Sequence, residues 1–403
     1  MSGPVTGRHY KTGRPVEVSL ADGVISAVTE LPEHPSMAEW PWLAPGLVDV
    51  QVNGGWGLDL NTLPLAPGTV LALSRRLLAR GVTGYCPTLI TNGEPQLAQA
   101  ASAIAAAVRQ DAGAGAAVLG IHLEGPFLSP EDGPRGAHPK EHIRPPDWDA
   151  FLRWQEAAEG LIRIVTVSPE WPDALEFISR CRAAGVIVSI GHTAATPEQI
   201  REAVAAGAAM STHLGNGTHL TLPRHPNYVW EQLAADELYG CMIADGQHLP
   251  PSLLKVILRT KQARAILVSD AVSLSGMPAG TYRLHIGGEV VLTGEGRLHL
   301  AGSPGLLAGS TMMLPDQAAY LVRTGLARLD EALDCASVHP ARLLGLDQAA
   351  GLAAGAPADL IRFRLGAGAF EGIECWKNGR KLPRGNENGN GNKNGNGQVV
   401  GGG

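Results

Sequence analysis

The sequence has few features of a secreted, membrane or nucleic-acid-binding protein. Its five cysteines are scattered and form no Cys-x-x-Cys pair, which argues against a disulfide framework or a thiolate zinc site. The first residues lack the apolar core of a signal peptide, and no run of about 18 apolar residues could cross a membrane. No Lys/Arg-rich block accompanies the formal net charge of −6, so nothing indicates a nucleic-acid surface. These absences favour a soluble, cytoplasmic protein that acts on a small molecule.

Short apolar runs alternate along the chain with stretches rich in Ala, Leu and Arg. The chain has 403 residues and 44% hydrophobic content, which is enough for a large core. Eight runs are strand-like, namely 47–52, 84–90, 118–123, 162–167, 186–190, 210–213, 241–244 and 265–269. Because strands that alternate with helices form parallel sheets, these runs predict an α/β fold with a closed (β/α)8 TIM barrel. A doubly wound open sheet is the alternative fold.

The two ends of the chain are predicted to form a second, smaller domain. Residues 14–45 and 355–383 are β-rich, so we expect them to pair into a small β-sandwich beside the barrel. The small domain would comprise residues 1–45 and 351–384, and the barrel residues 46–350, with short strands near 280–302. Residues 385–403 are Asn/Gly-rich and are expected to be disordered, because they cannot bury enough apolar surface to fold.

Four residues suited to metal or acid–base chemistry lie at the ends of predicted strands. They are Glu124, His192, His213 and Asp270. A parallel barrel brings such strand ends together around one opening. Two imidazoles and one carboxylate are a recognised catalytic zinc set, so we expect Glu124, His192 and His213 to hold one divalent ion, Zn²⁺ or alternatively Fe²⁺, Mn²⁺ or Co²⁺. Asp270 can then accept a proton from water, which predicts a metal-assisted hydrolase.

The first predicted strand bears on the number of metal ions. Gln51 and Asn53 stand at alternate positions where many barrel metallohydrolases place a His-x-His pair. Amides are poor ligands for zinc beside histidine, so the pattern predicts one ion, not two. Taken singly, His192 or His213 could be a buried, hydrogen-bonded structural histidine. Their occurrence at strand ends together with the two carboxylates favours the metal site.

Taken together, the motifs resemble the N-acetylglucosamine-6-phosphate deacetylases of the amidohydrolase superfamily. The similarity runs in family order over about residues 14–380, in the segments 45–55, 122–128, 136–138, 189–193, 212–216, 243–248, 268–271, 307–310 and 339–345. The resemblance implies a single-metal site, with Asp270 as general base and then general acid. It also implies removal of acetate from an N-acetyl amino sugar, usually as its 6-phosphate, in amino-sugar catabolism.

The resemblance further implies a set of substrate contacts. These are Ala137, His138, Asn216, Gly217, Arg224, Asp245, His248, Leu307, Ala308 and Gly309. Arg224 is the expected phosphate-binding cation, since a guanidinium can hold a phosphate through two hydrogen bonds. Residues 216–227 depart from the family pattern, so the sugar and its phosphorylation stay open. In the family this loop can reach a neighbouring subunit's site, which favours a homodimer.

Two other functions remain compatible with the sequence. A related hydrolase could act on another N-acyl compound, such as an unphosphorylated or epimeric amino sugar or an N-acyl amino acid. A protein of this fold could also bind a ligand without catalysis. The presence of all four central residues argues against the second alternative.

Overall fold

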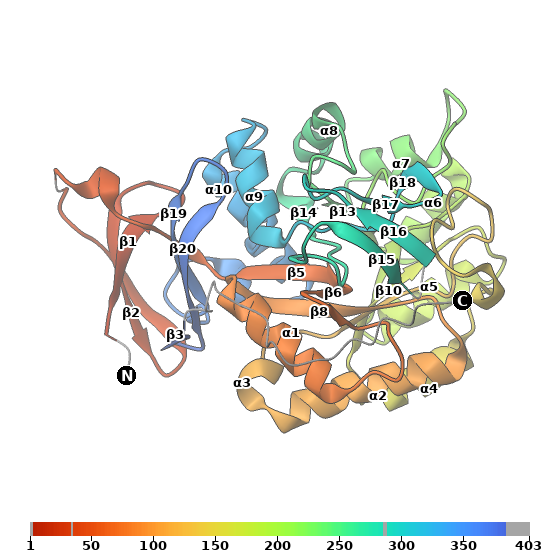
Figure 1. Ribbon diagram of the computed structural model, residues 1–403, viewed down its shortest axis with the longest axis horizontal. Coiled ribbons are helices and arrows are strands. Elements are labelled where there is room, and N and C mark those ends of the chain that lie inside the picture. Colours follow the sequence, from red (N-terminus) through yellow and green to blue (C-terminus); the bar gives the residue numbers. More distant parts are fainter. Residues whose placement is uncertain (1–2, 34, 285–287, 384–403) are drawn as a thin grey trace, which may run out of the picture.

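The centre of the computed structural model is an eight-stranded parallel barrel (Figure 1). The structure describes residues 3–33, 35–284 and 288–383. In barrel order the strands are β5 (Leu47–Val52), β8 (Val82–Ile90), β9 (Ile121–Glu124), β10 (Ile162–Val167), β11 (Ile187–Ile190), β12 (Met210–Ser211), β13 (Tyr239–Met242) and β14 (Ala265–Leu267). A parallel bridge between Val52 and Ala271 joins the segment that follows the last strand to the first strand. The predicted barrel is therefore confirmed over the open sheet.

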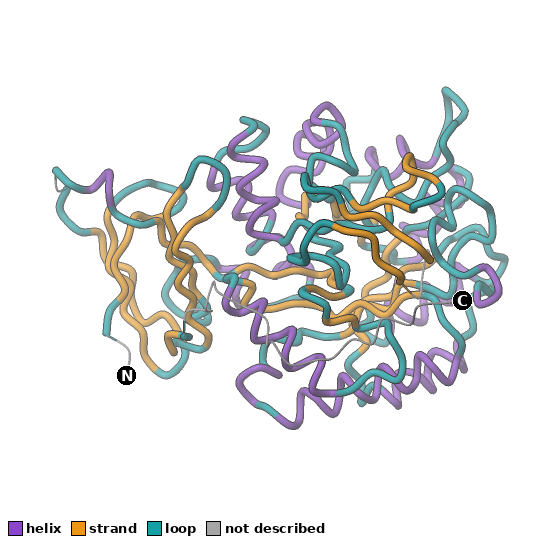
Figure 2. The backbone as a smooth tube through the Cα atoms, viewed as in Figure 1, coloured by secondary structure: helices purple, strands orange, loops and turns teal. Residues whose placement is uncertain are grey.

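Helices surround the barrel strands on the outside (Figure 2). They are α1 (Pro67–Ala79), α2 (Glu94–Gln110), α3 (Ala112–Gly115), α4 (Trp148–Ala157), α5 (Ala174–Ala183), α6 (Pro197–Ala206), α7 (Tyr228–Ala234), α8 (Pro251–Lys261), α9 (Leu314–Arg323), α10 (Leu329–Cys335) and α11 (Val338–Leu343), with short 3-10 turns η2 (Lys140–His142), η3 (Gln262–Arg264) and η4 (Asp347–Ala350). Another 3-10 turn, η1 (Met37–Glu39), precedes the first barrel strand and does not belong to this layer. Helix α6 shows how local sequence sets their limits. Thr196 caps its first turn together with Gln199, and Gly207, at φ 121°, ends it. No described helix is long and apolar enough to cross a membrane.

Both ends of the chain meet in one separate sheet. Its strands are β1 (Val5–His9), β2 (Pro15–Ala21), β3 (Val24–Glu30), β4 (Trp42–Pro45), β19 (Leu360–Leu365), β20 (Phe370–Lys377) and β21 (Arg380–Lys381). They are ordered β21-β20-β19-β4-β1-β2-β3, so the C-terminal strands pair with β4 and the expected sandwich is one continuous seven-stranded sheet. Figure 1 shows this sheet beside the barrel. The predicted disordered tail, residues 385–403, lies outside the described residues.

A third sheet lies against the barrel, within the region where short strands were expected. It is antiparallel and contains β15 (Gly280–Leu284), β16 (Gly288–Leu292), β17 (Leu298–Leu300) and β18 (Ser303–Leu307). The two-residue strands β6 (Gly54–Gly55) and β7 (Leu58–Asp59) follow the first barrel strand. Val272 N donates to Ser310 O at 3.0 Å, which ties the segment after β18 to the segment after β14. The sheet thereby stands beside the carboxyl ends of the barrel strands.

Candidate active site

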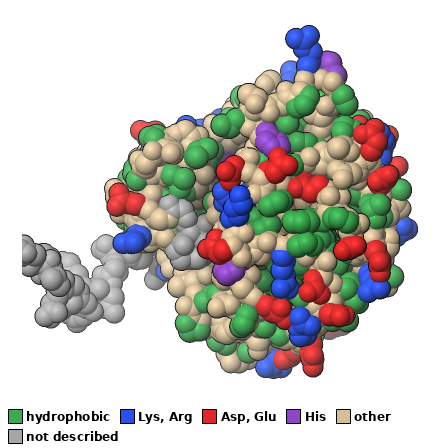
Figure 3. Space-filling model, turned by 90° about the vertical axis from the view of Figure 1, so that its right-hand side faces the viewer, with side chains coloured by type: hydrophobic (Ala, Val, Ile, Leu, Met, Phe, Trp, Pro, Cys, Tyr) green, Lys and Arg blue, Asp and Glu red, His purple; other side chains and the backbone are tan. Residues whose placement is uncertain are grey.

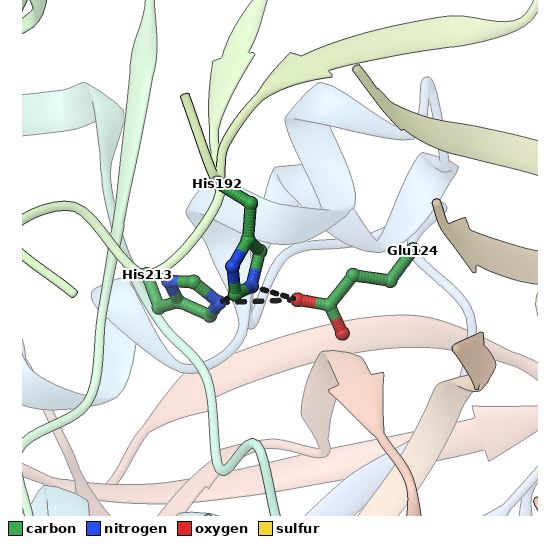
Figure 4. A group of neighbouring side chains, drawn as sticks. All are labelled: Glu124, His192 and His213. Atoms are coloured by element: carbon green, nitrogen blue, oxygen red, sulfur yellow. Dashed lines mark hydrogen bonds and ion pairs between the residues drawn. The ribbon is translucent and has the colours of Figure 1, made fainter. Parts of the chain in front are cut away.

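Three polar side chains meet at the carboxyl ends of barrel strands β9, β11 and β12. Glu124 is the last residue of β9, and His192 and His213 lie in the segments that follow β11 and β12. All three are buried. Figure 4 shows both imidazoles pointing at the Glu124 carboxylate. The barrel thus brings together three residues that lie tens of residues apart in the sequence.

The distances within this cluster suit a metal ion. The Nε2 atoms of His192 and His213 lie 3.2 Å and 3.0 Å from Glu124 Oε1, and 3.1 Å from each other. The three ligand atoms all lie within 4.8 Å of one another. Two nitrogens and one oxygen that converge in this way match the donor set of a catalytic zinc site.

The tautomer of His192 fits the same role. Its Nδ1 lies 2.7 Å from Pro134 O. A carbonyl oxygen can only accept a hydrogen bond, so Nδ1 carries a proton; in the neutral ring the lone pair is then on Nε2, which faces the cluster. Metal-binding histidines are commonly oriented by such a bond from their other nitrogen. His192 is therefore prepared as a ligand by the backbone of the loop before His138.

The electrostatics of the cluster keep Glu124 ionised. Burial alone would raise the pKa of Glu124, but the hydrogen bonds and charge of His192 and His213 hold this pKa well below its usual value. Burial likewise opposes the cationic form of His213, yet its bond to Glu124 raises the pKa of His213. A buried carboxylate that attracts two imidazoles would attract a divalent cation for the same reason.

The amides of the first strand contact both carboxylates. Gln51 Nε2 donates to Glu124 Oε1 at 3.1 Å, and Asn53 Nδ2 donates to Asp270 Oδ1 at 2.8 Å. Each amide thus holds one oxygen of a carboxylate at the site. The number of metal ions stays a prediction.

Asp270 is held at the pocket with an unusual backbone and a raised pKa. Burial and the neighbouring charge of Glu124 raise the pKa of Asp270 to about 6, while His213, His248 and the bond from Asn53 lower it. A bound divalent cation would lower this pKa further, because it stabilises the carboxylate. Asp270 (φ 47°) shares left-handed backbone with His192 (φ 50°) and His213 (φ 28°). Such strained conformations concentrate at functional sites.

A pocket of about 510 Å³ opens above this cluster. The metal-ligand candidates and Asp270 line it, together with these predicted substrate contacts: Ala137, His138, Asn216, Gly217, His248, Leu307, Ala308 and Gly309. Asp245 stands behind the wall, where its Oδ2 accepts from His248 Nδ1 at 2.7 Å. Arg224 is exposed on the loop before α7 and does not line this pocket.

Two histidines of the wall present defined faces to the pocket. Burial and repulsion from His192 lower the pKa of His138 to about 3, so its ring is neutral. His138 Nδ1 lies 2.9 Å from Thr91 Oγ1, and its Nε2 points back towards the cluster, 3.3 Å from His192 Nε2. Burial would raise the pKa of Asp245, but the bond from His248 keeps this pKa low. Asp245 therefore orients His248 with its Nε2 available to a ligand.

Several residues at or near the pocket carry no signal in the sequence. Thr91 contacts His138 and Pro134 contacts His192, each a histidine that is distant along the chain. The wall also contains Asp59, Asn61, Leu220, Leu284, Arg297 and Leu306, none of which belongs to a recognisable motif. Arg297 and its neighbours belong to the third sheet. These residues reach the pocket because the third sheet packs beside the barrel, which no local sequence pattern indicates.

Comparison with known proteins agrees with this geometry. The model of the Amidohydrolase family matches residues 42–383. An N-acetylglucosamine-6-phosphate deacetylase of Bos taurus is 38% identical over 330 residues, which are 79% of this chain and 78% of the bovine protein. An N-acetylgalactosamine-6-phosphate deacetylase of Escherichia coli O157:H7 is 34% identical over 331 residues, 82% of this chain and 85% of that protein.

A solved structure supports the same relationship. It is an Asp-to-Ala variant of the N-acetyl-D-glucosamine-6-phosphate deacetylase from Mycobacterium smegmatis, in complex with N-acetyl-D-glucosamine-6-phosphate. It matches with a TM-score of 0.80 at 33% identity, and the match covers 91% of this chain and 94% of that chain. By sequence and by structure, the chain belongs to the amidohydrolase family.

Proposed function

We propose that this protein hydrolyses the N-acetyl group of N-acetylglucosamine 6-phosphate to glucosamine 6-phosphate and acetate. The observation that carries the proposal is the convergence of the Glu-His-His cluster and Asp270 in one pocket. Relatives that cover most of the chain are deacetylases of 6-phosphorylated N-acetyl amino sugars, which supports the substrate class. An amino-sugar deacetylase needs both the cluster and a proton-transfer group.

The reaction breaks the amide C–N bond and forms a C–O bond to water. An ion held by Glu124, His192 and His213 would supply the Lewis acidity that activates water and polarises the amide carbonyl. Asp270 accepts a proton from the water and later donates it to the amine nitrogen that leaves. Asn53 holds Asp270 Oδ1 in place, which leaves Oδ2 for this transfer.

The histidines of the wall position the substrate. His138 is neutral and lies beside the cluster, so its Nε2 can bond to the acetamido group without adding charge. His248 is fixed by Asp245 and presents its Nε2 to the sugar. The backbone of Gly217 and Gly309, both at positive φ, approaches the sugar closely without side-chain obstruction.

The remaining features complete the proposal. Zn²⁺ is the proposed ion, because two imidazoles with one carboxylate suit its tetrahedral preference. The five cysteines are all free and buried, in keeping with a reducing cytoplasm. The exposed loop that carries Arg224 is the proposed contact of a homodimer.

On the face drawn in Figure 3, acidic and basic side chains are interspersed around hydrophobic ones.

The direct test is acetate release by purified, zinc-loaded protein. N-acetylglucosamine 6-phosphate, free N-acetylglucosamine and an N-acetyl amino acid are compared at equal concentration. A preference for the phosphorylated sugar supports the proposal. Turnover of the N-acetyl amino acid alone would identify N-acyl amino acids as the substrate class. No turnover of any of the three compounds would favour a binding protein.

A second candidate substrate is N-acetylgalactosamine 6-phosphate. The similarity to the E. coli protein, with 34% identity across most of both chains, favours it directly. The two sugars differ only at C4, so one contact to a hydroxyl group decides between them. The ratio of kcat/KM for the two epimers, measured on the same preparation, distinguishes the two candidates.

A further inference from the structure

One cation enters the pocket from an unexpected side. Arg297 lies in the turn between β16 and β17, and it is the one Lys or Arg among the pocket-lining residues of the described chain. The catalytic cluster comes from the barrel, whereas Arg297 comes from the antiparallel sheet that forms a separate wall. A cation at this place faces the same cavity as the metal-ligand candidates.

The turn that carries Arg297 is fixed to the barrel. Arg297 N donates to Thr293 Oγ1 at 3.2 Å, and Thr293 N donates to Arg297 O at 2.9 Å. Thr311 Oγ1 donates to Gly296 O, and the neighbouring Ser310 forms a parallel bridge with Ala271 beside Asp270. These bonds hold the turn at a defined place relative to the catalytic carboxylate.

The guanidinium of Arg297 keeps most of its donors for a ligand. One of its five N–H groups donates to Pro304 O at 2.9 Å, and within the described part of the chain no carboxylate forms an ion pair with it. Leu284 and Leu306 line the same wall, so a ligand that reaches Arg297 is partly shielded from water. Shielding strengthens an interaction between a cation and an anion.

The proposed substrate carries a phosphate that a cation in the pocket wall can bind. The acetamido group on C2 and the phosphate on C6 leave the pyranose ring in different directions, so an acetamido group at the cluster carries the phosphate to the pocket wall. We propose that Arg297 binds the 6-phosphate of the substrate within the same subunit. This inference rests on the proposed function. Arg224, the cation expected from sequence, is exposed and outside this pocket.

The kinetic test compares Arg297→Ala with a matched control. Arg283→Ala removes an exposed arginine from β15 of the same sheet, outside the pocket lining. Loss of charge-assisted hydrogen bonds should raise the KM of Arg297→Ala for N-acetylglucosamine 6-phosphate roughly ten- to hundredfold. KM for N-acetylglucosamine and kcat for both should stay within about threefold, and Arg297→Lys should recover part of the loss. An unchanged KM in Arg297→Ala, or an equal rise for both sugars, would overturn the proposal.

A binding measurement keeps the two proposals separable. Calorimetry of zinc-loaded protein with glucosamine 6-phosphate and with glucosamine requires no turnover. Arg297→Ala should weaken only the binding of the phosphate ester, and Arg283→Ala should weaken neither. If wild-type protein releases no acetate, the proposed reaction fails while this comparison still decides the role of Arg297. Weakened binding in Arg224→Ala, with Arg297→Ala unchanged, would assign the phosphate to the exposed loop instead.

Discussion

Replacing Asp270 by Asn separates proton transfer from every other role of the pocket. The amide has nearly the same shape as the carboxylate, and its oxygen can still accept the 2.8 Å bond from Asn53 Nδ2. The backbone bond from Asp270 N to Gln51 O, 3.0 Å long, does not involve the side chain. Metal content and substrate affinity should therefore stay close to wild type.

Turnover should fall steeply, because an amide can neither take a proton from water nor deliver one to the amine. General acid–base catalysis contributes about 10²–10⁴-fold, so kcat of Asp270→Asn should fall about a thousandfold, which is a rise of about 4 kcal/mol in the barrier. The base must be ionised, and a bound cation lowers the pKa of Asp270 below its metal-free value of about 6. The acid limb of kcat/KM should therefore lie below pH 6.

Acetate release and the number of metal ions per chain are measured on the same preparation of each variant. Asp49→Asn serves as the control, since Asp49 is another fully buried carboxylate of the barrel but does not line the pocket. Its kcat should remain within about threefold of wild type at pH 8. A kcat for Asp270→Asn within tenfold of wild type, at full metal content, would refute the assignment of Asp270 as the base.

Three further predictions follow from single contacts. Chelation should lower the melting temperature of wild-type protein by several degrees, because an ion at 1,000 times its Kd adds about 4 kcal/mol; Glu124→Gln should show no such shift in thermal unfolding. Asn53→Ala removes the donor to Asp270 and should lower kcat about tenfold, measured by acetate release, at unchanged metal content. Burial raises the pKa of Asp49 from 3.8 to about 7, so between these values the folded state holds one more proton than the unfolded state. As the pH rises through this window, the free energy of unfolding should fall by about 1.4 kcal/mol per pH unit. Urea unfolding measured at several pH values should show this decrease for wild-type protein and lack it for Asp49→Asn.

The sequence predicted the barrel and the convergence of Glu124, His192 and His213, because both depend on local patterns. Each ligand candidate lies at or just after the end of a short apolar strand, and the ends of parallel strands must meet. The strand limits were less accurate, since the predicted run 118–123 became β9 (Ile121–Glu124), with Glu124 inside the strand. The run 210–213 became the two-residue β12 (Met210–Ser211), because His213 adopts left-handed backbone that a strand cannot contain.

The pocket wall was less accessible to sequence reasoning. Arg297 follows a Gly-Glu-Gly turn that resembles any hairpin turn, and only the packing of the third sheet brings it to the cavity. Arg224 belongs to the segment 216–227, whose first residues line the pocket. Arg224 itself is exposed and lies outside the pocket of its own chain. Motif spacing indicates which residues end strands, whereas the direction of a long loop depends on contacts that are remote in sequence.

Glu124, His192 and His213 are the proposed ligands of one catalytic ion in an amino-sugar deacetylase. The most direct measurement is acetate release from N-acetylglucosamine 6-phosphate by the purified protein, with bound metal quantified in the same sample. Release should rise in proportion to metal content and saturate at about one ion per chain. Release that is independent of metal, or that requires two ions per chain, would contradict this assignment.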